Sequence, residues 1–381
     1  MDFDFTWLLW GLPLAFAAGW GASRLDLRQW RMESRQAPKA YFRGLNHLLN
    51  EQQDQAIDAF IEAVQGDPDT AELHFALGNL FRRRGDYDRA VRVHEHLLSR
   101  ADLSNKDRDR AQHALALDFL KAGLLDRAEA ALNKLQGSAF EGEALLALLG
   151  IYERSRDWAR AKEIAQRLEA AEQGSFSTRL AHYLCEEAEI ARQGGDGMQA
   201  LHLLEEAVQQ APQLSRSWMA LSAQKAQSGD AAGALNALLR LNQHAPQGLP
   251  LAAHSLADLA RQTGREAEVV EILQASHERA PSIDITQALA SLSPNHEAAR
   301  NRYLSHLERE PSLVITAQWM AGETLSSERA QVRVQQALEQ ASAPLRRYRC
   351  AACGFEARQH FWQCPGCQAW DSYPARRVEE L

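Results

Sequence analysis

From about residue 37, the chain repeats one pattern of small, aromatic and apolar residues with a period of about 34 residues. The segment AELHFALGNLFRRRGDYDRAVRVHEHLLSRAD (71–102) aligns with RSWMALSAQKAQSGDAAGALNALLRLNQHAP (216–246), and YFRGLNHLLNEQQDQAIDAFIEAVQGDP (41–68) follows the same order. Small residues at fixed offsets let two antiparallel helices approach closely, and a proline marks the end of the second helix. The recurring positions include Leu77, Gly78, Phe81, Gly85, Tyr87 and Ala90; Trp218, Leu221, Ser222, Gly229, Ala234, Leu238 and Pro246; and Gly44, Ala56, Phe60, Ala63 and Pro68.

This order of residues is the tetratricopeptide pattern, so the sequence predicts an all-α repeat solenoid over residues 37–343. The units near the C-terminal end are degenerate, and we expect further helices there to cap the array. Stacked repeats of this kind form a concave groove that is usually a binding surface. Asn79, Arg82 and Arg83 occupy first-helix positions that commonly face such a groove. They are candidates for partner contacts, with a solvated polar face as the alternative.

Composition and charge agree with a helical, acidic protein. Of the 381 residues, 45% are hydrophobic and only 7% aromatic, and alanine and leucine are abundant, which favours helices over sheets. The formal net charge is −8, so no basic field extends over the whole chain to hold nucleic acid. Nucleic acid is therefore not expected as a partner, although a local basic patch stays open.

Residues 5–23 contain no charged side chain over 19 positions. As a helix they would extend about 28 Å, close to the roughly 30 Å of a bilayer core. A cleaved signal peptide and a buried core helix are the alternatives, but acidic residues precede the apolar run where a signal peptide needs positive charge. We therefore predict a single-pass anchor at 1–23 that contacts membrane lipid. Arginines in the following linker, 24–36, predict that the bulk of the chain is cytoplasmic and the N-terminus periplasmic.

Sequence motifs of catalysis are absent. The chain contains no phosphate-binding glycine loop, no dinucleotide fingerprint, no H-E-x-x-H and no G-x-S-x-G. His94 and His96 are two apart and would point to different faces of a helix. His182 and Cys185 could share a face, but a buried cysteine in a helix is ordinarily a small hydrophobic residue. We therefore predict that the protein is not an enzyme.

Four of the five cysteines lie in the last stretch of the chain, RYRCAACGFEARQHFWQCPGCQAWDSY. Two C-x-x-C pairs with ten residues between them predict two knuckles around one closed tetrathiolate site, which suits Zn or a single Fe. The predicted ligands are Cys350, Cys353, Cys364 and Cys367. A closed site has no open coordination position, so its default role is structural. Two disulfides or a redox C-x-x-C pair are the alternatives.

The residues around these knuckles predict a small module over 344–381. Gly354 follows the first pair, where a positive φ is typical, and the ten residues between the pairs suit a short hairpin. The expected apolar cover of the metal is Phe355, Phe361, Trp362 and Trp370. Six arginines could offset the charge of the site or contact a phosphate or acidic partner: Arg346, Arg347, Arg349, Arg358, Arg376 and Arg377.

The order of parts, an apolar N-terminal segment, a tetratricopeptide array and the RYRCAACGF…FWQCPGCQAW tail, resembles the lipopolysaccharide assembly protein B family over the full length. The tail is similar to the family's rubredoxin-type knuckles. Gln368 stands where an ordinary rubredoxin has glycine, and the loop between the knuckles is shorter than in a true rubredoxin. Both differences weaken an electron-transfer role.

The resemblance implies an adaptor at the bacterial inner membrane that regulates lipopolysaccharide synthesis. Its implied partners are the membrane protease FtsH, its substrate LpxC (the lipid A deacetylase), and an inner-membrane lipopolysaccharide sensor that would contact the region of the anchor. By position, it also implies that the four cysteines of the tail are the metal ligands. Two alternatives come from other classes: an electron carrier on a repeat scaffold, and a scaffold for another inner-membrane complex. The oligomeric state stays open, a homo-oligomer included, as does the packing of the tail on the repeats.

Overall fold

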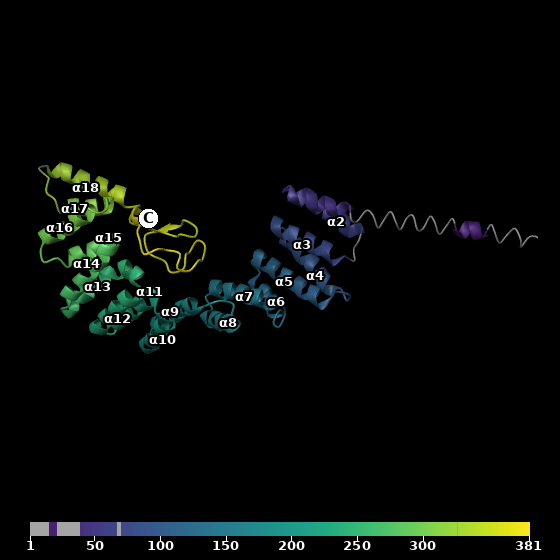
Figure 1. Cartoon of the computed structure of the whole chain (residues 1–381), viewed down its shortest axis with the longest axis horizontal. Helices are drawn as coiled ribbons and strands as arrows, with labels where there is room; N and C mark the ends of the chain where they lie inside the picture. The colour runs from purple at the N-terminus through teal and green to yellow at the C-terminus, as the bar shows by residue number, and fades with distance from the viewer. Residues whose placement is uncertain (1–14, 21–38, 67–69, 326) are drawn as a thin grey trace, which may run out of the picture. The chain divides into compact units, whose positions relative to one another are not determined.

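The structure is a computed structural model that describes residues 15–20, 39–66, 70–325 and 327–381 (Figure 1). The described residues divide into two compact units between Asp157 and Trp158, and we describe each unit separately. The predicted anchor and linker, 1–23 and 24–36, lie outside the described residues except for 15–20, which are helical. Among the helices in the described ranges, none is long and apolar enough to cross a membrane.

The first unit is built from helix pairs, as the repeat pattern predicts. After a helical segment at 39–49, its elements are α2 (Gln53–Gly66), α3 (Ala71–Arg84), α4 (Tyr87–Ser99), α5 (Asn105–Ala122), α6 (Leu125–Asn133) and α7 (Glu141–Ser155). Helices α3 and α4 pack very closely at Gly78, where an added Cβ would lie 2.5 Å from Nε2 of the buried His94. Only glycine fits at this crossing, which explains the small residue at this position of the repeat.

The second unit continues the helix pairs and ends in the cysteine module. Its elements are α8 (Trp158–Ala170), α9 (Ser177–Gln193), α10 (Gly197–Gln210), α11 (Ser215–Gln227), α12 (Ala231–His244), η1 (Pro246–Gly248), α13 (Leu249–Thr263), α14 (Glu266–Arg279), α15 (Ile283–Ser291), α16 (His296–Leu307), α17 (Leu313–Ala321), α18 (Glu328–Ser342), β1 (Tyr348–Arg349), β2 (Glu356–Ala357) and η2 (Val378–Glu380). One continuous apolar core runs through α9–α15. Such a core is expected when each repeat buries its apolar face against its neighbours.

The helices near the C-terminal end are irregular, in agreement with the degenerate sequence. Helices α15 and α17 are each only 9 residues long. Helix α18 buries only Ser342 among its residues, so it is a mostly exposed last helix of the array.

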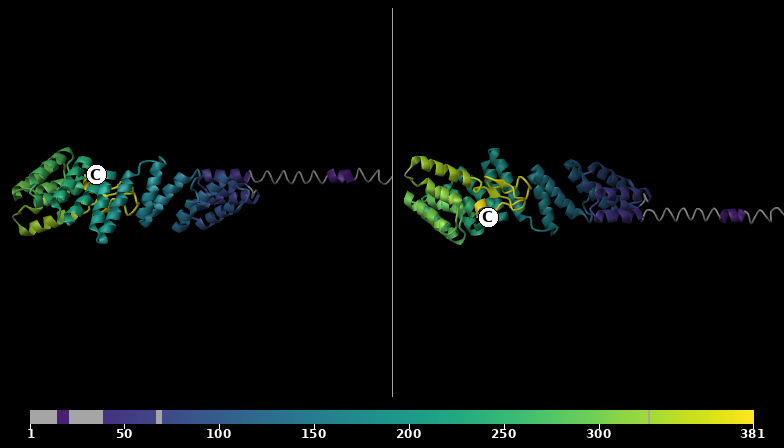
Figure 2. Two further views of the ribbon diagram at one scale, coloured as in Figure 1. Left: turned by 90° about the horizontal axis from the view of Figure 1, so that it is seen from below. Right: turned by 90° about the horizontal axis from the view of Figure 1, so that it is seen from above.

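The cysteine module lies against the helices of its own unit, as both views in Figure 2 show. Its two strands pair antiparallel, with Tyr348 opposite Ala357 and Arg349 opposite Glu356. The hairpin therefore encloses the first cysteine pair. The prediction of a hairpin lying between the two pairs was wrong, because the first C-x-x-C turn itself reverses the chain and brings the residues on either side of it together.

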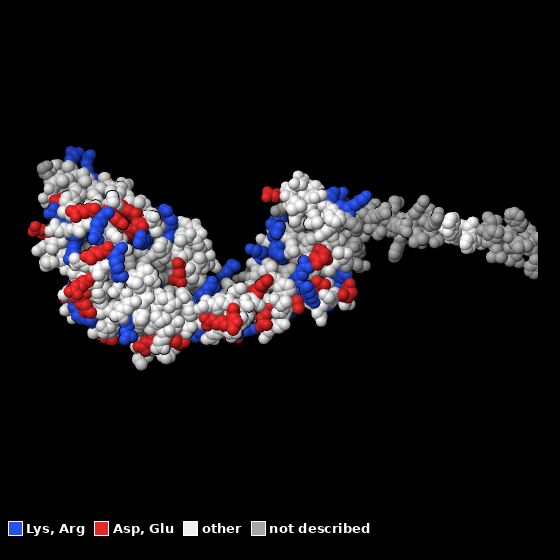
Figure 3. All heavy atoms as spheres, in the orientation of Figure 1, with Lys and Arg blue, Asp and Glu red and all other residues white. Residues whose placement is uncertain are grey.

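Charges of both signs are mixed on the surface. On the face drawn in Figure 3, acidic and basic side chains are interspersed over the described helices. Many charged side chains of the described helices form ion pairs between neighbouring positions, such as Arg192 with Glu189 and Arg261 with Asp258. This face therefore carries no extended basic stripe of the kind that nucleic acid requires.

Candidate metal centre

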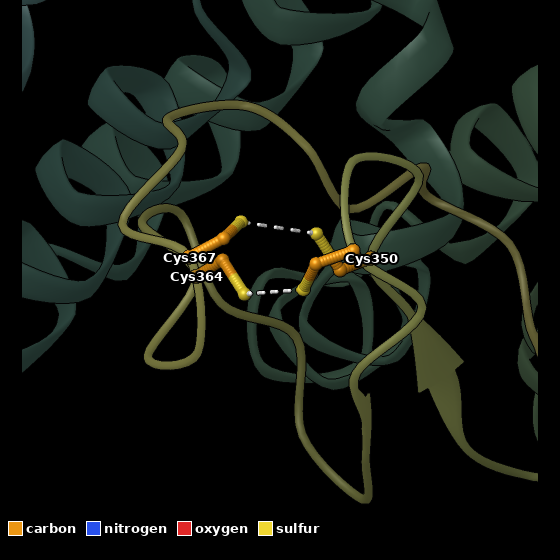
Figure 4. A group of neighbouring side chains, drawn as sticks. Cys350, Cys364 and Cys367 are labelled. Atoms are coloured by element: carbon orange, nitrogen blue, oxygen red, sulfur yellow. Dashed lines mark hydrogen bonds between the residues drawn. The ribbon is translucent and has the colours of Figure 1, made fainter. Parts of the chain in front are cut away.

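The four cysteine sulfurs of the tail converge on one point. All four Sγ atoms lie within 4.8 Å of one another. The two knuckles face each other, with Cys350 Sγ 3.8 Å from Cys367 Sγ and Cys353 Sγ 3.7 Å from Cys364 Sγ (Figure 4). A tetrahedral ion with metal–sulfur bonds of about 2.3 Å requires sulfur–sulfur distances of about 3.8 Å. The four side chains therefore fit one tetrathiolate-bound metal ion.

The two knuckles have the same backbone geometry. In the first, the Gly354 N–H donates to the Cys350 carbonyl at 2.9 Å, and in the second the Gln368 N–H donates to the Cys364 carbonyl at 2.8 Å. Both residues adopt a positive φ, 78° for Gly354 and 62° for Gln368. The positive φ predicted at Gly354 is confirmed. Gln368 takes the equivalent left-handed conformation although it is not glycine, at a cost in backbone strain.

Hydrogen bonds favour the thiolate form of the two buried cysteines. Cys350 and Cys364 are each only 1% exposed, whereas Cys353 and Cys367 are at the surface. Burial raises the pKa of the Cys350 thiol, but hydrogen bonds with the Ser372 hydroxyl and with the backbone N–H groups of residues 353 and 352 outweigh it and bring the pKa to about 6. Backbone N–H groups of residues 367 and 366 likewise lower the pKa of Cys364 against burial.

Two tyrosines supply most of the apolar support of the metal site. Tyr348 and Tyr373 are buried in one cluster with Cys350 and Cys364, and the partly buried Phe361 packs against it. The Tyr373 hydroxyl also donates to the Phe355 carbonyl at 3.1 Å. The predicted aromatic cover was thus partly wrong. The Phe355 side chain stays 45% exposed, and sequence reasoning missed both tyrosines, whose only signal was their position just outside the knuckles.

Trp370 and Asp371 join the second knuckle to helix α9. The Trp370 ring stacks on the His182 ring at a centroid distance of 4.5 Å and meets the edge of Tyr183. His182 is fully buried; its Nε2 donates to the Asp371 carboxylate at 2.9 Å, while its Nδ1 accepts from Arg216 at 3.3 Å. Burial lowers the pKa of His182, so the imidazole is neutral, with the proton on Nε2 and the free lone pair on Nδ1. Trp370 therefore docks the module on the repeats rather than covering the metal.

The end of the chain forms a second contact with the repeats, at α15 and α17. Arg377 forms a two-pronged ion pair with Asp284, at 2.9 and 2.7 Å, and lies 4.2 Å from the Tyr348 ring centroid. The Glu380 carboxylate accepts the Ile283 N–H at 2.7 Å, and the Glu379 carboxylate accepts the Ser312 hydroxyl at 2.6 Å and the N–H of the next residue. Carboxylates at helix N-termini accept hydrogen bonds from the free N–H groups there and interact favourably with the positive end of the helix dipole.

Four of the arginines near the site are held by carboxylates. Arg346 pairs with Glu339, Arg347 and Arg349 both pair with Glu356, and Arg377 pairs with Asp284. Burial alone would raise the pKa of Asp284, but hydrogen bonds from His254 and Arg377 outweigh it and lower that pKa. These guanidinium groups hold the module together and against the helices. The role in offsetting thiolate charge that the sequence suggested for them stays a prediction.

The candidate groove residues of the first unit belong to an inter-repeat network. The Arg82 guanidinium donates to the Asp118 carboxylate at 2.8 Å and to Asn79. Asp118 also binds the ring of His94, and both are fully buried. Arg83 is exposed. Two of the three candidates thus take part in packing between repeats, and their predicted contact with a partner stays a prediction.

Two family models match parts of the chain. Residues 348–373 match the family described as a rubredoxin metal binding domain, and residues 73–109 match a tetratricopeptide repeat. A solved tetratricopeptide repeat protein from Parabacteroides merdae is 14% identical, with a TM-score of 0.34 over 68% of this chain and 99% of its own. Fold and site together define a tetratricopeptide repeat protein with a rubredoxin-type module at its C-terminal end.

Full-length relatives then identify the family. The lipopolysaccharide assembly protein B of Escherichia coli K12 is 32% identical over 97% of this chain and 98% of its own length. The protein of the same name from Haemophilus influenzae is 26% identical over 95% of this chain and 96% of its own. The chain belongs to the lipopolysaccharide assembly protein B family.

Proposed function

We propose that this protein is an inner-membrane adaptor that regulates lipopolysaccharide synthesis. The observation that carries the proposal is the match to relatives named for lipopolysaccharide assembly over 97% of the chain, repeats and cysteine module included. A repeat array offers an extended surface for holding another protein, and a closed four-sulfur site offers structural support rather than an open metal position. Both properties suit a scaffold better than an enzyme.

The proposed action is to promote proteolysis of LpxC by FtsH. The array holds LpxC as a client, and the anchor at 1–23 keeps the client close to the membrane protease, which raises its effective concentration there. An inner-membrane lipopolysaccharide sensor relieves this control by contacting the anchor or its surroundings. What supports this assignment is the family resemblance together with the uncharged segment and the basic linker that follows it.

The test of this function is the lifetime of LpxC in cells. Deleting the gene is expected to lengthen the half-life of LpxC and raise its steady-state level, and a plasmid copy of the gene restores both. A strain with an active FtsH but without this protein in which LpxC decays at the ordinary rate would contradict the proposal.

We also propose that the four cysteines hold one Zn or Fe ion whose role is structural. Cys350→Ser is expected to lose the metal and unfold the module, because the thiolates carry the folding energy that so small a module lacks. Cys185→Ser is the matched control, since this buried helix residue lies outside the cluster. Elemental analysis of the purified proteins measures the metal. Equal metal content in both variants would contradict the ligand assignment, and a reversible thiolate-to-iron absorption change would favour electron transfer instead.

A further inference from the structure

The cysteine module contacts the repeats of its unit at two separate places. Trp370 and Asp371 contact α9 through His182. Residues 377–380 contact the N-terminal ends of α15 and α17, through the ion pair with Asp284 and through the two glutamate carboxylates. Between these contacts lies a cleft of about 650 Å³, lined by loops and helix ends of the repeats on one side and by the module on the other.

Each contact is connected to a different knuckle. Trp370 follows the second knuckle after three residues. The first knuckle begins two residues after Tyr348, whose ring is covered by Arg377, and the Val378 N–H donates to the Arg347 carbonyl at 2.7 Å. The short sulfur–sulfur contacts both run between knuckles, Cys350 to Cys367 and Cys353 to Cys364. A metal ion at this point therefore joins the part of the module attached to α9 to the part attached to α15 and α17.

The other links between the two parts all lie beside the cysteines. The Ala351 N–H donates to the Ser372 carbonyl at 2.7 Å, the Tyr373 hydroxyl donates to the Phe355 carbonyl at 3.1 Å, and both knuckles share the buried tyrosine cluster. These contacts form only while the two knuckles face each other. The sheet contains only two residue pairs. Without the ion, no bond joins the sulfurs of one knuckle to the sulfurs of the other.

We propose that the bound metal is a brace that fixes the spacing between α9 and the α15–α17 end of the array. Loss of the metal then changes the conformation of that end. Removal of the ion separates the knuckles and releases residues 377–380. The N-terminal ends of α15 and α17 then lose the carboxylates of Glu380 and Glu379, and the cleft changes width. This inference rests on the metal centre proposed above, and it concerns neither FtsH nor LpxC.

Hydrogen exchange of the full-length protein in detergent, followed by mass spectrometry, tests the brace. The reporters are the amides of Ile283, Leu313 and Val314, which donate to the two tail carboxylates. Metal-loaded protein is compared with protein stripped by a chelator, and elemental analysis records the metal in each sample. Stripping is expected to speed exchange of these amides at least tenfold. Adding back the metal restores the slow rate.

Two metal-loaded variants separate the brace from general unfolding. Glu379→Ala is expected to speed exchange at residues 313 and 314 with its metal retained, because it removes the carboxylate directly. Arg358→Ala, which removes an exposed side chain of the module, is expected to exchange like wild type. Unchanged exchange in stripped protein would overturn the brace while leaving the metal centre in place. Absence of metal from the purified wild type would overturn the metal centre itself.

Discussion

At the scale of single residues, the second knuckle contains backbone strain at Gln368 that a substitution can relieve. Gln368 has a φ of 62°, where glycine costs less than any residue with a side chain. Gln368→Gly is therefore expected to stabilise the metal-loaded module by about 0.5–1 kcal/mol, after the entropy that glycine adds to the unfolded chain is subtracted. Chemical denaturation followed by the tyrosine and tryptophan signals measures the change. Ala352→Gly, at a position in the other knuckle without a positive φ, is the control and is expected to destabilise it.

His277 makes the stability of the second unit depend on pH. Burial, together with the nearby charges of His306, Arg309 and Arg302, lowers its pKa to about 4. In the unfolded chain the pKa is about 6.5. Between these values the unfolded state binds a proton that the folded state does not, so the free energy of unfolding falls as the pH falls from about 6.5 to about 4, and this contribution is fully present above that range.

His277→Gln is expected to remove this contribution. We expect the wild type to lose about 1–2 kcal/mol more than the variant between about pH 7 and pH 4.5, a figure reduced for solvent screening of a half-buried group. Urea unfolding of both proteins at the two pH values measures the difference, and effects of the thiolates cancel because they are common to both. An equal loss in the two proteins would show that His277 is charged in the folded state.

At the scale of elements, docking of the module on α9 depends on one indole. Trp370 packs against His182, Tyr183 and Trp158, all buried. Trp370→Ala is expected to destabilise the second unit by about 2–3 kcal/mol, at the low end for a tryptophan because the side chain is only partly buried. Trp362→Ala is the control, because its ring meets His360 within the module. Urea midpoints with matched metal content provide the comparison, and equal losses would place the indole outside the docking contact.

The helices and the two knuckles were predictable from the sequence because both signals are local. Gly78 and its counterparts recur at a fixed spacing, and each C-x-x-C pair is one turn. The docking contacts were not predictable, because His182 and Asp371 are 189 residues apart and no periodicity connects them. Asp118 was missed for a similar reason: it reads as one more polar residue of a helix, yet it is buried against His94 and Arg82 of another repeat.

At the scale of the whole molecule, the proposed function depends on confinement to the membrane. Deleting residues 1–23 is expected to move the protein out of the membrane fraction, to leave the repeats folded, and to lengthen the half-life of LpxC to that of the deletion strain. Cell fractionation, circular dichroism and a chase of LpxC measure the three effects. An unrelated single-pass segment in place of 1–23 is the control. If confinement suffices, this segment restores LpxC decay. The sensor, however, no longer relieves that control, because its contact with the anchor is missing. Full control of LpxC by the truncated protein would show that confinement is dispensable.

The central claim, that the protein brings LpxC to FtsH, is tested most directly by capturing its partners. Full-length protein is crosslinked in cells, purified from membranes through an affinity tag, and its partners are identified by mass spectrometry, with an anchored bait lacking residues 37–343 as the control. The account predicts that FtsH and LpxC are recovered together with the full-length bait and that LpxC is lost with the control. Recovery of neither, with a different enzyme complex in their place, would contradict it.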